Sequence, residues 1–151
     1  MGWGVTAVKD KIYIGGISKV LILNTDGSRV REITTDVVYN YNLLYNERND
    51  QLLFRQSGHR LCCINLDGDV IYRYNISGVE GLAVDQQGHV YTSGRFSHDI
   101  HRLSPDGTLR DIVLSEHDGI DGPLGITFNN DFTKLFIING GGKTVLVYSC
   151  N

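Results

Sequence analysis

Proline is scarce in this sequence: there are 2 prolines among 151 residues, although there are 18 glycines. So little proline excludes collagen-like repeats and proline-rich linkers, whereas abundant glycine is typical of a chain with many tight turns. No apolar run approaches the roughly 20 residues that a membrane-spanning helix needs. The first residues show neither the basic start nor the apolar stretch of a signal peptide. We therefore expect no membrane segment and a cytoplasmic protein.

Cysteine and basic residues are also few. The three cysteines, Cys62, Cys63 and Cys150, form no Cys-x-x-Cys pair, which excludes a zinc finger or RING domain within this chain and argues against a disulfide scaffold. The net charge is −3, and it is unevenly divided: residues 1–78 hold nine Lys and Arg against eight Asp and Glu, and residues 79–151 hold five against nine. Neither part has the basic surplus of a general nucleic-acid-binding protein, although a local basic patch would be compatible with RNA.

What the sequence does contain is a repeat. The dipeptide Asp-Gly occurs at Asp26-Gly27, Asp67-Gly68 and Asp106-Gly107, at intervals of 41 and 39 residues. Each dipeptide follows three strand-like apolar segments and precedes a more polar one, so the repeating unit is predicted to be four short strands. Asp-Gly is typical of a type I′ hairpin, in which both central residues have positive φ. These aspartates are therefore expected to be turn residues and not catalytic groups.

Four-stranded antiparallel units that recur with this period indicate an all-β chain with a β-propeller fold, each unit forming one blade. We predict blades at about residues 4–36, 40–77, 79–115 and 122–151, the last without its outer strand. The whole chain, 1–151, is then one partial propeller of about 3¾ four-stranded blades, interpreted as an incomplete six-bladed ring. In such a blade the first strand is innermost and the charged fourth strand is outermost.

The third unit resembles a known repeat. Residues 81–91 read Gly-Leu-Ala-Val-Asp-Gln-Gln-Gly-His-Val-Tyr, and residues 123–128 read Pro-Leu-Gly-Ile-Thr-Phe. Both resemble the NHL repeat, and the resemblance implies the C-terminal part of a propeller like those of tripartite-motif (TRIM-NHL) ubiquitin ligases. In that family the propeller recognises a protein or RNA partner, and a separate RING carries the ligase activity. The resemblance therefore implies a binding module without ligase activity of its own, with a protein as the first expectation for the partner and RNA as the second.

A second interpretation is an enzyme. The senescence-marker/gluconolactonase family consists of six-bladed propellers that hold a metal ion with Glu, Asn and Asp at the starts of inner strands. Glu80 and Asn42 stand where such ligands would lie, but the family's Pro-Asn-Gly step is Pro123-Leu124-Gly125 here, and leucine cannot ligate a hard cation. We therefore predict no catalytic residue, no metal and no cofactor. A third interpretation is a truncated product without independent activity.

The candidate binding residues lie in loops that a propeller places on one face. Arg95, Phe96 and His98 fall between the second and third strands of the third unit, where an aromatic and a cation together are typical contact residues. Glu80 begins the inner strand of that unit, and the long acidic loop before the fourth unit adds Glu116, His117, Asp118 and Asp121. The plainer alternatives are that Phe96 packs between blades and that the acidic loop is only a solvated turn. His98, Asp99 and His101 match no zinc signature.

The last apolar segment, Val145–Tyr148, is predicted to lack a neighbouring strand on one side. An unpaired apolar edge favours association. We therefore expect self-association through this open blade edge.

Overall fold

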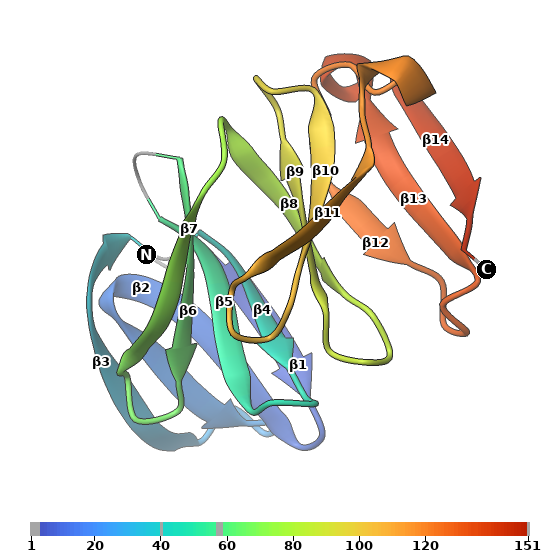
Figure 1. Cartoon of the computed structure of the whole chain (residues 1–151). Coiled ribbons are helices and arrows are strands. Elements are labelled where there is room, and N and C mark those ends of the chain that lie inside the picture. The colour runs from blue at the N-terminus through green and yellow to red at the C-terminus, as the bar shows by residue number, and fades with distance from the viewer. Residues whose placement is uncertain (1–3, 40, 57–58, 151) are drawn as a thin grey trace. The chain divides into compact units, whose positions relative to one another are not determined.

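The computed structural model describes residues 4–39, 41–56 and 59–150, and it is built of antiparallel sheets (Figure 1). The chain divides into two compact units, residues 1–74 and 75–151. None of the helical segments in this described part is long and apolar enough to cross a membrane.

The first unit holds two sheets. The first sheet is formed by β1 (Gly4–Val8), β2 (Lys11–Asn24) and β3 (Arg29–Tyr39). The second sheet is formed by β4 (Tyr41–Asn46), β5 (Gln51–Gln56), β6 (Arg60–Asn65) and β7 (Val70–Asn75), in that order across the sheet.

The second unit holds the other two sheets. The third sheet is formed by β8 (Val79–Val84), β9 (Val90–Gly94), β10 (Asp99–Leu103) and β11 (Leu109–Leu114). The fourth sheet is formed by β12 (Ile126–Phe128), β13 (Lys134–Asn139) and β14 (Thr144–Ser149). There are two short 3-10 turns in the described part of this unit: η1 (Glu116–Asp118) lies between β11 and β12, and η2 (Gly140–Gly142) lies between β13 and β14. The all-β prediction and the four repeating sheets are confirmed.

The first sheet departs from the expected four-strand pattern because the chain does not reverse at Gly15-Gly16. β2 continues through this step as one long strand, pairing with β1 through its first part and with β3 through its second part. Neither glycine has a positive φ, and within β2 only Ser18 has one, at 53°. A single left-handed residue produces a bulge, seen as the register shift between Ile17 and Lys19, whereas a tight hairpin needs a complete turn.

The Asp-Gly turns connect strands as predicted, but they are not of type I′. In each turn only the glycine has a positive φ, 87° at Gly27, 97° at Gly68 and 88° at Gly107. The glycine N–H donates to the carbonyl three residues earlier, as Gly107 does to Ser104 at 2.9 Å. This is a type I turn followed by a left-handed glycine, the three-residue hairpin loop. The Asp26 carboxylate accepts hydrogen bonds from the Ser28 hydroxyl and the Ser28 N–H, and the Asp106 carboxylate accepts the Thr108 N–H. These bonds lower the pKa of both carboxyl groups.

The sheets within each unit pack face to face. In the first unit, Tyr13, Val20 and Ile22 of the first sheet are buried against Leu52 and Phe54 of the second. In the second unit, Ala83, Tyr91 and Ile100 of the third sheet are buried with Leu135 and Ile137 of the fourth. Each unit therefore has its own hydrophobic core.

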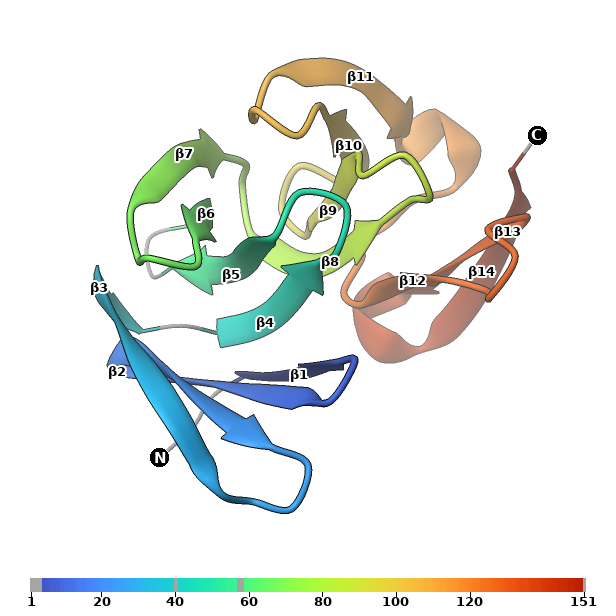
Figure 2. The same ribbon diagram turned by 90° about the horizontal axis from the view of Figure 1, so that it is seen from below.

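The inner strands of each unit approach closely. Figure 2 shows β1 beside β4 in the first unit and β8 beside β12 in the second. Glycine makes the approach possible, because a Cβ on Gly4 would lie 2.6 Å from the backbone nitrogen of Leu43, and one on Gly81 would lie 2.8 Å from that of Ile126.

Candidate functional site: a loop cluster in the second unit

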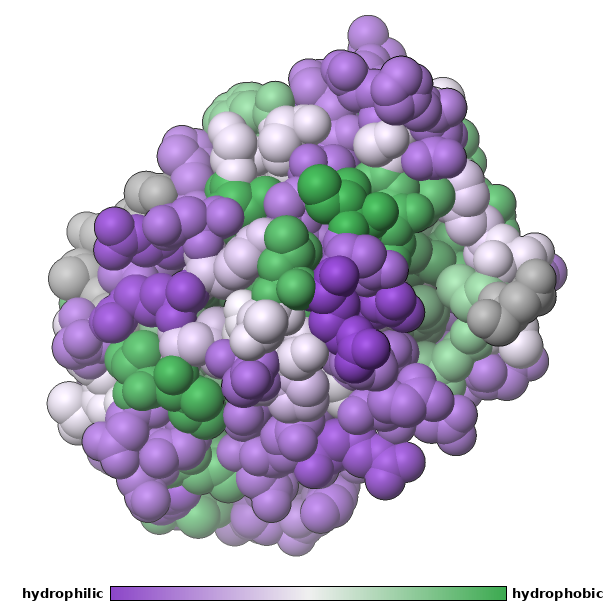
Figure 3. Space-filling model, in the orientation of Figure 1, coloured by the Kyte–Doolittle hydropathy of each residue, from purple (hydrophilic) through white to green (hydrophobic). Residues whose placement is uncertain are grey.

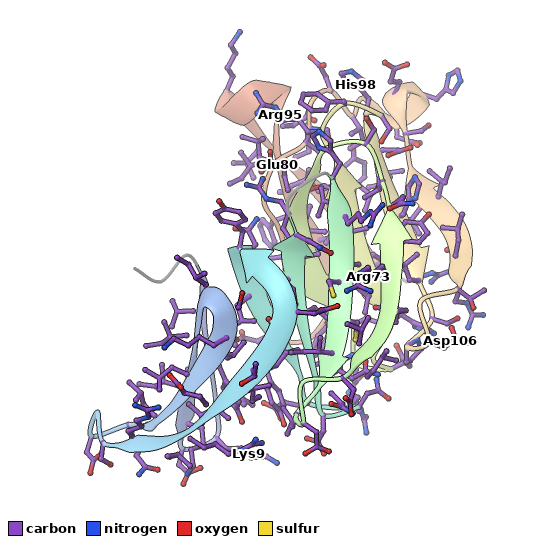
Figure 4. The ribbon with its side chains drawn as sticks, turned by 90° about the vertical axis from the view of Figure 1, so that its left-hand side faces the viewer. Lys9, Arg73, Glu80, Arg95, His98 and Asp106 are labelled. Carbon is purple, nitrogen blue, oxygen red and sulfur yellow. The ribbon has the colours of Figure 1, made fainter. Side chains whose placement is uncertain are left out.

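Loops at one end of the second unit gather into a single surface. We call it the loop cluster; it comprises residues 77–80, 95–98, 115–122 and 140–143. Figure 4 shows Glu80, Arg95 and His98 at this end and Asp106, from an Asp-Gly turn, at the opposite end of the third sheet. The prediction that these loops share a face, away from the Asp-Gly turn, holds in this unit.

Arg95 and Phe96 are presented by a backbone that is fixed on both sides. The Arg95 N–H donates to the Gly78 carbonyl at 2.8 Å, and the Phe96 N–H donates to the Ser77 carbonyl at 3.1 Å. The Phe96 ring lies against Gly78, where a Cβ would come within 2.9 Å of Cδ2. Phe96 is 58% exposed. This exposure does not favour the alternative that Phe96 packs between blades.

Arg95 lies between an aromatic ring and a carboxylate. Its guanidinium carbon is 5.7 Å from the centroid of the Phe96 ring, within the range of a cation–π contact. Its Nη1 is 3.9 Å from Oε1 of Glu80, a loose ion pair at the surface. The structure therefore places Arg95 beside two other predicted binding residues, Glu80 and Phe96.

His98 joins its loop to the loop before the fourth sheet. Its φ is 56°, and its Nδ1 accepts the Gly122 N–H at 2.9 Å. Because a backbone N–H can only donate, this contact assigns the imidazole proton to Nε2. Oδ1 of Asp121 lies 3.2 Å from the same Nδ1. His98 therefore positions residues 121–122, and it is only partly available to a partner.

The acidic loop is ordered by its own residues. The Ser115 N–H donates to the Asp118 carboxylate at 2.9 Å, and the Asp118 carbonyl accepts the Tyr148 hydroxyl at 2.6 Å. Burial and the nearby Asp118 raise the pKa of Tyr148. Asp118 thus has a structural role, whereas the side chains of Glu116 and His117 are exposed on η1. The predicted acidic surface is present, but only part of it is available for contact.

Two buried side chains hold the cluster together. The sequence placed Asn139 on this face but did not predict its contacts, and it gave no sign of Ser93. Asn139 accepts the Asp121 N–H at 2.8 Å and donates to the Gly119 carbonyl at 3.1 Å. Ser93 accepts the Gly81 N–H at 2.7 Å and donates to the Leu124 carbonyl at 2.6 Å, which ties β8, β9 and the start of the fourth sheet together. No local motif signals these contacts, because the partners lie 12 to 31 residues apart.

The titratable groups do not gather as metal ligands would. Within the described ranges, no group of three or more His, Cys, Asp or Glu side chains could hold a metal ion. Asp99 contacts His101, Oδ2 to Nε2 at 2.9 Å, and Ser97 at 2.6 Å, while His98 turns to residues 121–122. Of the two residues considered for the lactonase-type site, Asn42 belongs to the first unit and Glu80 to the second.

Comparison with known proteins identifies the fold. No family model matches the sequence, and no curated protein matches it. Several solved structures, in contrast, match the fold of this chain. The β-propeller domain of Cps50 (Swd1) from Myceliophteria thermophila matches with a TM-score of 0.76 and 12% identity over 100% of this chain and 51% of that one. The chain has the β-propeller fold.

Two other matches extend the same conclusion. Virginiamycin B lyase from Staphylococcus aureus matches with a TM-score of 0.62 and 15% identity, over 98% of this chain and 69% of that chain. An auxiliary nutrient binding protein from Bacteroides ovatus matches with a TM-score of 0.74 and 16% identity, over 99% of this chain and 38% of that chain. The chain spans about half the length of the Cps50 propeller domain that it matches. At such identities the likeness shows the fold alone.

Proposed function

We propose that this chain is a propeller binding module that recognises a protein partner through the loop cluster. The observation that carries the proposal is the exposed Phe96 ring, held over Gly78 with the Arg95 guanidinium beside it. Aromatic and arginine side chains dominate binding energy at protein interfaces when rigid neighbours hold them in place. Here the neighbouring loops are held by the backbone bonds of residues 95–96 and by the Asn139 and His98 contacts.

The negative net charge of the second unit favours a protein partner over RNA. The second unit carries five Lys and Arg against nine Asp and Glu, so its field repels a polyphosphate backbone. The exposed Glu116 and His117 and the carboxylate of Asp121 border the loop cluster and favour a partner with basic groups near an apolar contact residue. RNA recognition remains the second candidate because an aromatic beside an arginine also suits single-stranded bases.

A more specific role is suggested by the resemblance of residues 81–91 to the NHL repeat. On that basis we propose the role that such propellers have in TRIM-NHL proteins, the recognition of a substrate for a RING carried elsewhere. No catalytic residue, metal or cofactor forms part of this proposal.

A cytoplasmic location is part of the same proposal. Cys62, Cys63 and Cys150 are free thiols, and burial raises the pKa of Cys62 to about 11 and that of Cys63 to about 12. Thiols with raised pKa values stay protonated and unreactive at neutral pH. Free cysteines of this kind are usual in a reducing compartment.

The experiment is quantitative affinity enrichment with three forms of the chain: the wild type, the double variant Arg95→Ala/Phe96→Ala, and the control Leu109→Ala/Arg110→Ala. The control removes an exposed apolar residue and an adjacent arginine from β11, beside the Asp-Gly turn. We expect proteins enriched by the wild type and the control to lose at least tenfold in affinity for the loop variant, since a hot-spot residue contributes about 2 kcal/mol or more.

Direct titration of the enriched protein, and of single-stranded RNA by fluorescence anisotropy, completes the test. Equal binding of a genuine partner to the wild type and to the loop variant would contradict the site. RNA binding that the loop variant loses and the control keeps would replace the protein partner with RNA.

A further inference from the structure

His98 faces two groups of opposite kind at one nitrogen. Its Nδ1 lies 2.9 Å from the Gly122 nitrogen and 3.2 Å from Oδ1 of Asp121. The Gly122 N–H can only donate a hydrogen bond, and an ionised carboxylate can only accept one. Nδ1 carries either a lone pair or a proton, so it can bond to only one of these groups at a time. The protonation state of His98 therefore decides between Gly122 and Asp121.

Each protonation state of His98 releases one of the two groups. In the neutral state Nδ1 accepts the Gly122 N–H, and the Asp121 side chain, which is 76% exposed, is available to solvent. In the protonated state Nδ1 donates to the Asp121 carboxylate in a charge-assisted hydrogen bond, and the Gly122 N–H loses its acceptor. Histidine is the side chain that normally changes its charge between about pH 5 and pH 8. A modest change of pH thus exchanges one contact for the other.

The rest of this loop is held by bonds that do not change with pH. The Asp121 N–H donates to the Asn139 side-chain oxygen at 2.8 Å, and the Asp121 carbonyl accepts the Gly140 N–H at 2.6 Å. Backbone and amide groups do not titrate in the range where histidine does. We therefore expect protonation of His98 to redirect the Asp121 carboxylate and release the Gly122 N–H while the loop itself stays in place.

The charges around His98 do not oppose its protonation. Asp121, which contacts the imidazole, is acidic, while the nearby Arg95 turns its guanidinium to Glu80 at 3.9 Å. Asp99, the next residue, is held by other side chains of its own segment. The remaining titratable groups of the loop cluster are Glu116, His117, Asp118 and Lys143. Carboxylates outnumber cations in this set, so a positive imidazole is not repelled by its surroundings.

The imidazole lies where solvent reaches it. Figure 3 shows mostly hydrophilic side chains over the end of the second unit that carries η1, and the His98 side chain is 34% exposed. Its neighbours among the predicted binding residues do not respond to pH in this range, because Phe96 does not titrate and Arg95 stays charged. Asp121 is the predicted binding residue whose availability His98 controls.

We propose that His98 makes recognition at the loop cluster depend on pH, because only its neutral form leaves the Asp121 carboxylate to a cationic side chain of the partner. The inference rests on the proposed function, and it specifies the partner as a protein that presents a lysine or arginine beside an apolar residue. Since the partner binds the neutral form, protons compete with it, and its affinity rises with pH through the titration of His98. An exposed ion pair of this kind supports a change of about two- to fivefold.

Nuclear magnetic resonance of the complete chain tests the exchange of contacts without a partner. At about pH 7.5 the wild type should show a scalar coupling between the Gly122 nitrogen and Nδ1 of His98, and the Gly122 amide should be protected from hydrogen exchange. At about pH 5.5 the coupling should vanish and the protection should fall, because the ring is protonated. Both changes should follow the titration of the His98 ring resonances.

Two variants separate the roles of the two side chains. His98→Asn is the matched control: its Oδ1 stands where Nδ1 stands and accepts the Gly122 N–H at every pH, and asparagine tolerates the φ of 56° at this position. Its Gly122 protection should stay constant between about pH 5.5 and about pH 7.5. Asp121→Asn removes the charge of the acceptor, so the exchange of contacts should move to lower pH.

Titration of the enriched partner at both pH values completes the test, with circular dichroism to verify that each variant is folded. The wild type should lose about two- to fivefold in affinity at the lower pH, and His98→Asn should lose less. Gly122 protection that does not follow the ring titration, or an equal loss of affinity in the wild type and His98→Asn, would overturn the inference. Failure of the proposed function would appear separately, as undiminished binding by Arg95→Ala/Phe96→Ala.

Discussion

At the scale of the residue, the loop cluster depends on side chains that link distant segments. Arg95, Phe96 and His98 could be selected from the sequence because an aromatic and a cation in a loop between strands are recognisable there. The contacts of Ser93 and Asn139 could not be predicted, since a serine in a strand and an asparagine at the end of a strand carry no sign of the carbonyl they will meet. Asn139 is buried beneath the loop that it orders.

Ser93→Ala tests this view of the buried bonds. The change leaves the Gly81 N–H and the Leu124 carbonyl without the hydroxyl that joins them, which should lower the free energy of unfolding by about 1–3 kcal/mol. Urea unfolding followed by circular dichroism measures it. Ser104→Ala, in the Asp106-Gly107 turn, is the control and should stay within about 0.5 kcal/mol of the wild type. Equal stability of the two variants would show that the Ser93 bonds contribute little.

At the scale of the element, the repeat spacing predicted most strands because apolar segments and turn dipeptides recur in register. Two predictions failed for a common reason. The Asp-Gly turns use one left-handed residue where a type I′ turn needs two, and the chain at Gly15-Gly16 uses one at Ser18 where a reversal needs a full turn. The backbone conformation of such short segments depends on the strands around them, which the dipeptide alone does not specify.

Two glycine substitutions separate backbone strain from close packing. Gly27 has a φ of 87°, and a methyl group added to its Cα would meet no atom within 4 Å, so Gly27→Ala should cost only the left-handed strain, about 1–2 kcal/mol. Gly68→Ala adds a collision with the Thr34 carbonyl and a 3.1 Å contact with Cγ2 of Ile33, so it should cost at least about 1 kcal/mol more. Chemical denaturation of both variants gives the difference. Equal costs would mean that the Thr34 segment moves aside freely.

At the scale of the whole molecule, repetition explains the fold. The β-propeller fold was predicted from the sequence, but the side of the sheet on which each side chain lies could be assigned only from the pairing register. Alternation along β1 and β2 buries Tyr13 and exposes Val5, although both belong to apolar segments.

The most direct test of the account measures partner binding by the wild type, by Arg95→Ala/Phe96→Ala and by the control Leu109→Ala/Arg110→Ala. If the loop cluster is the recognition surface, the loop variant should lose at least tenfold in affinity for a protein that the wild type and the control bind equally. Equal binding of a genuine partner by the loop variant and the wild type would contradict the account.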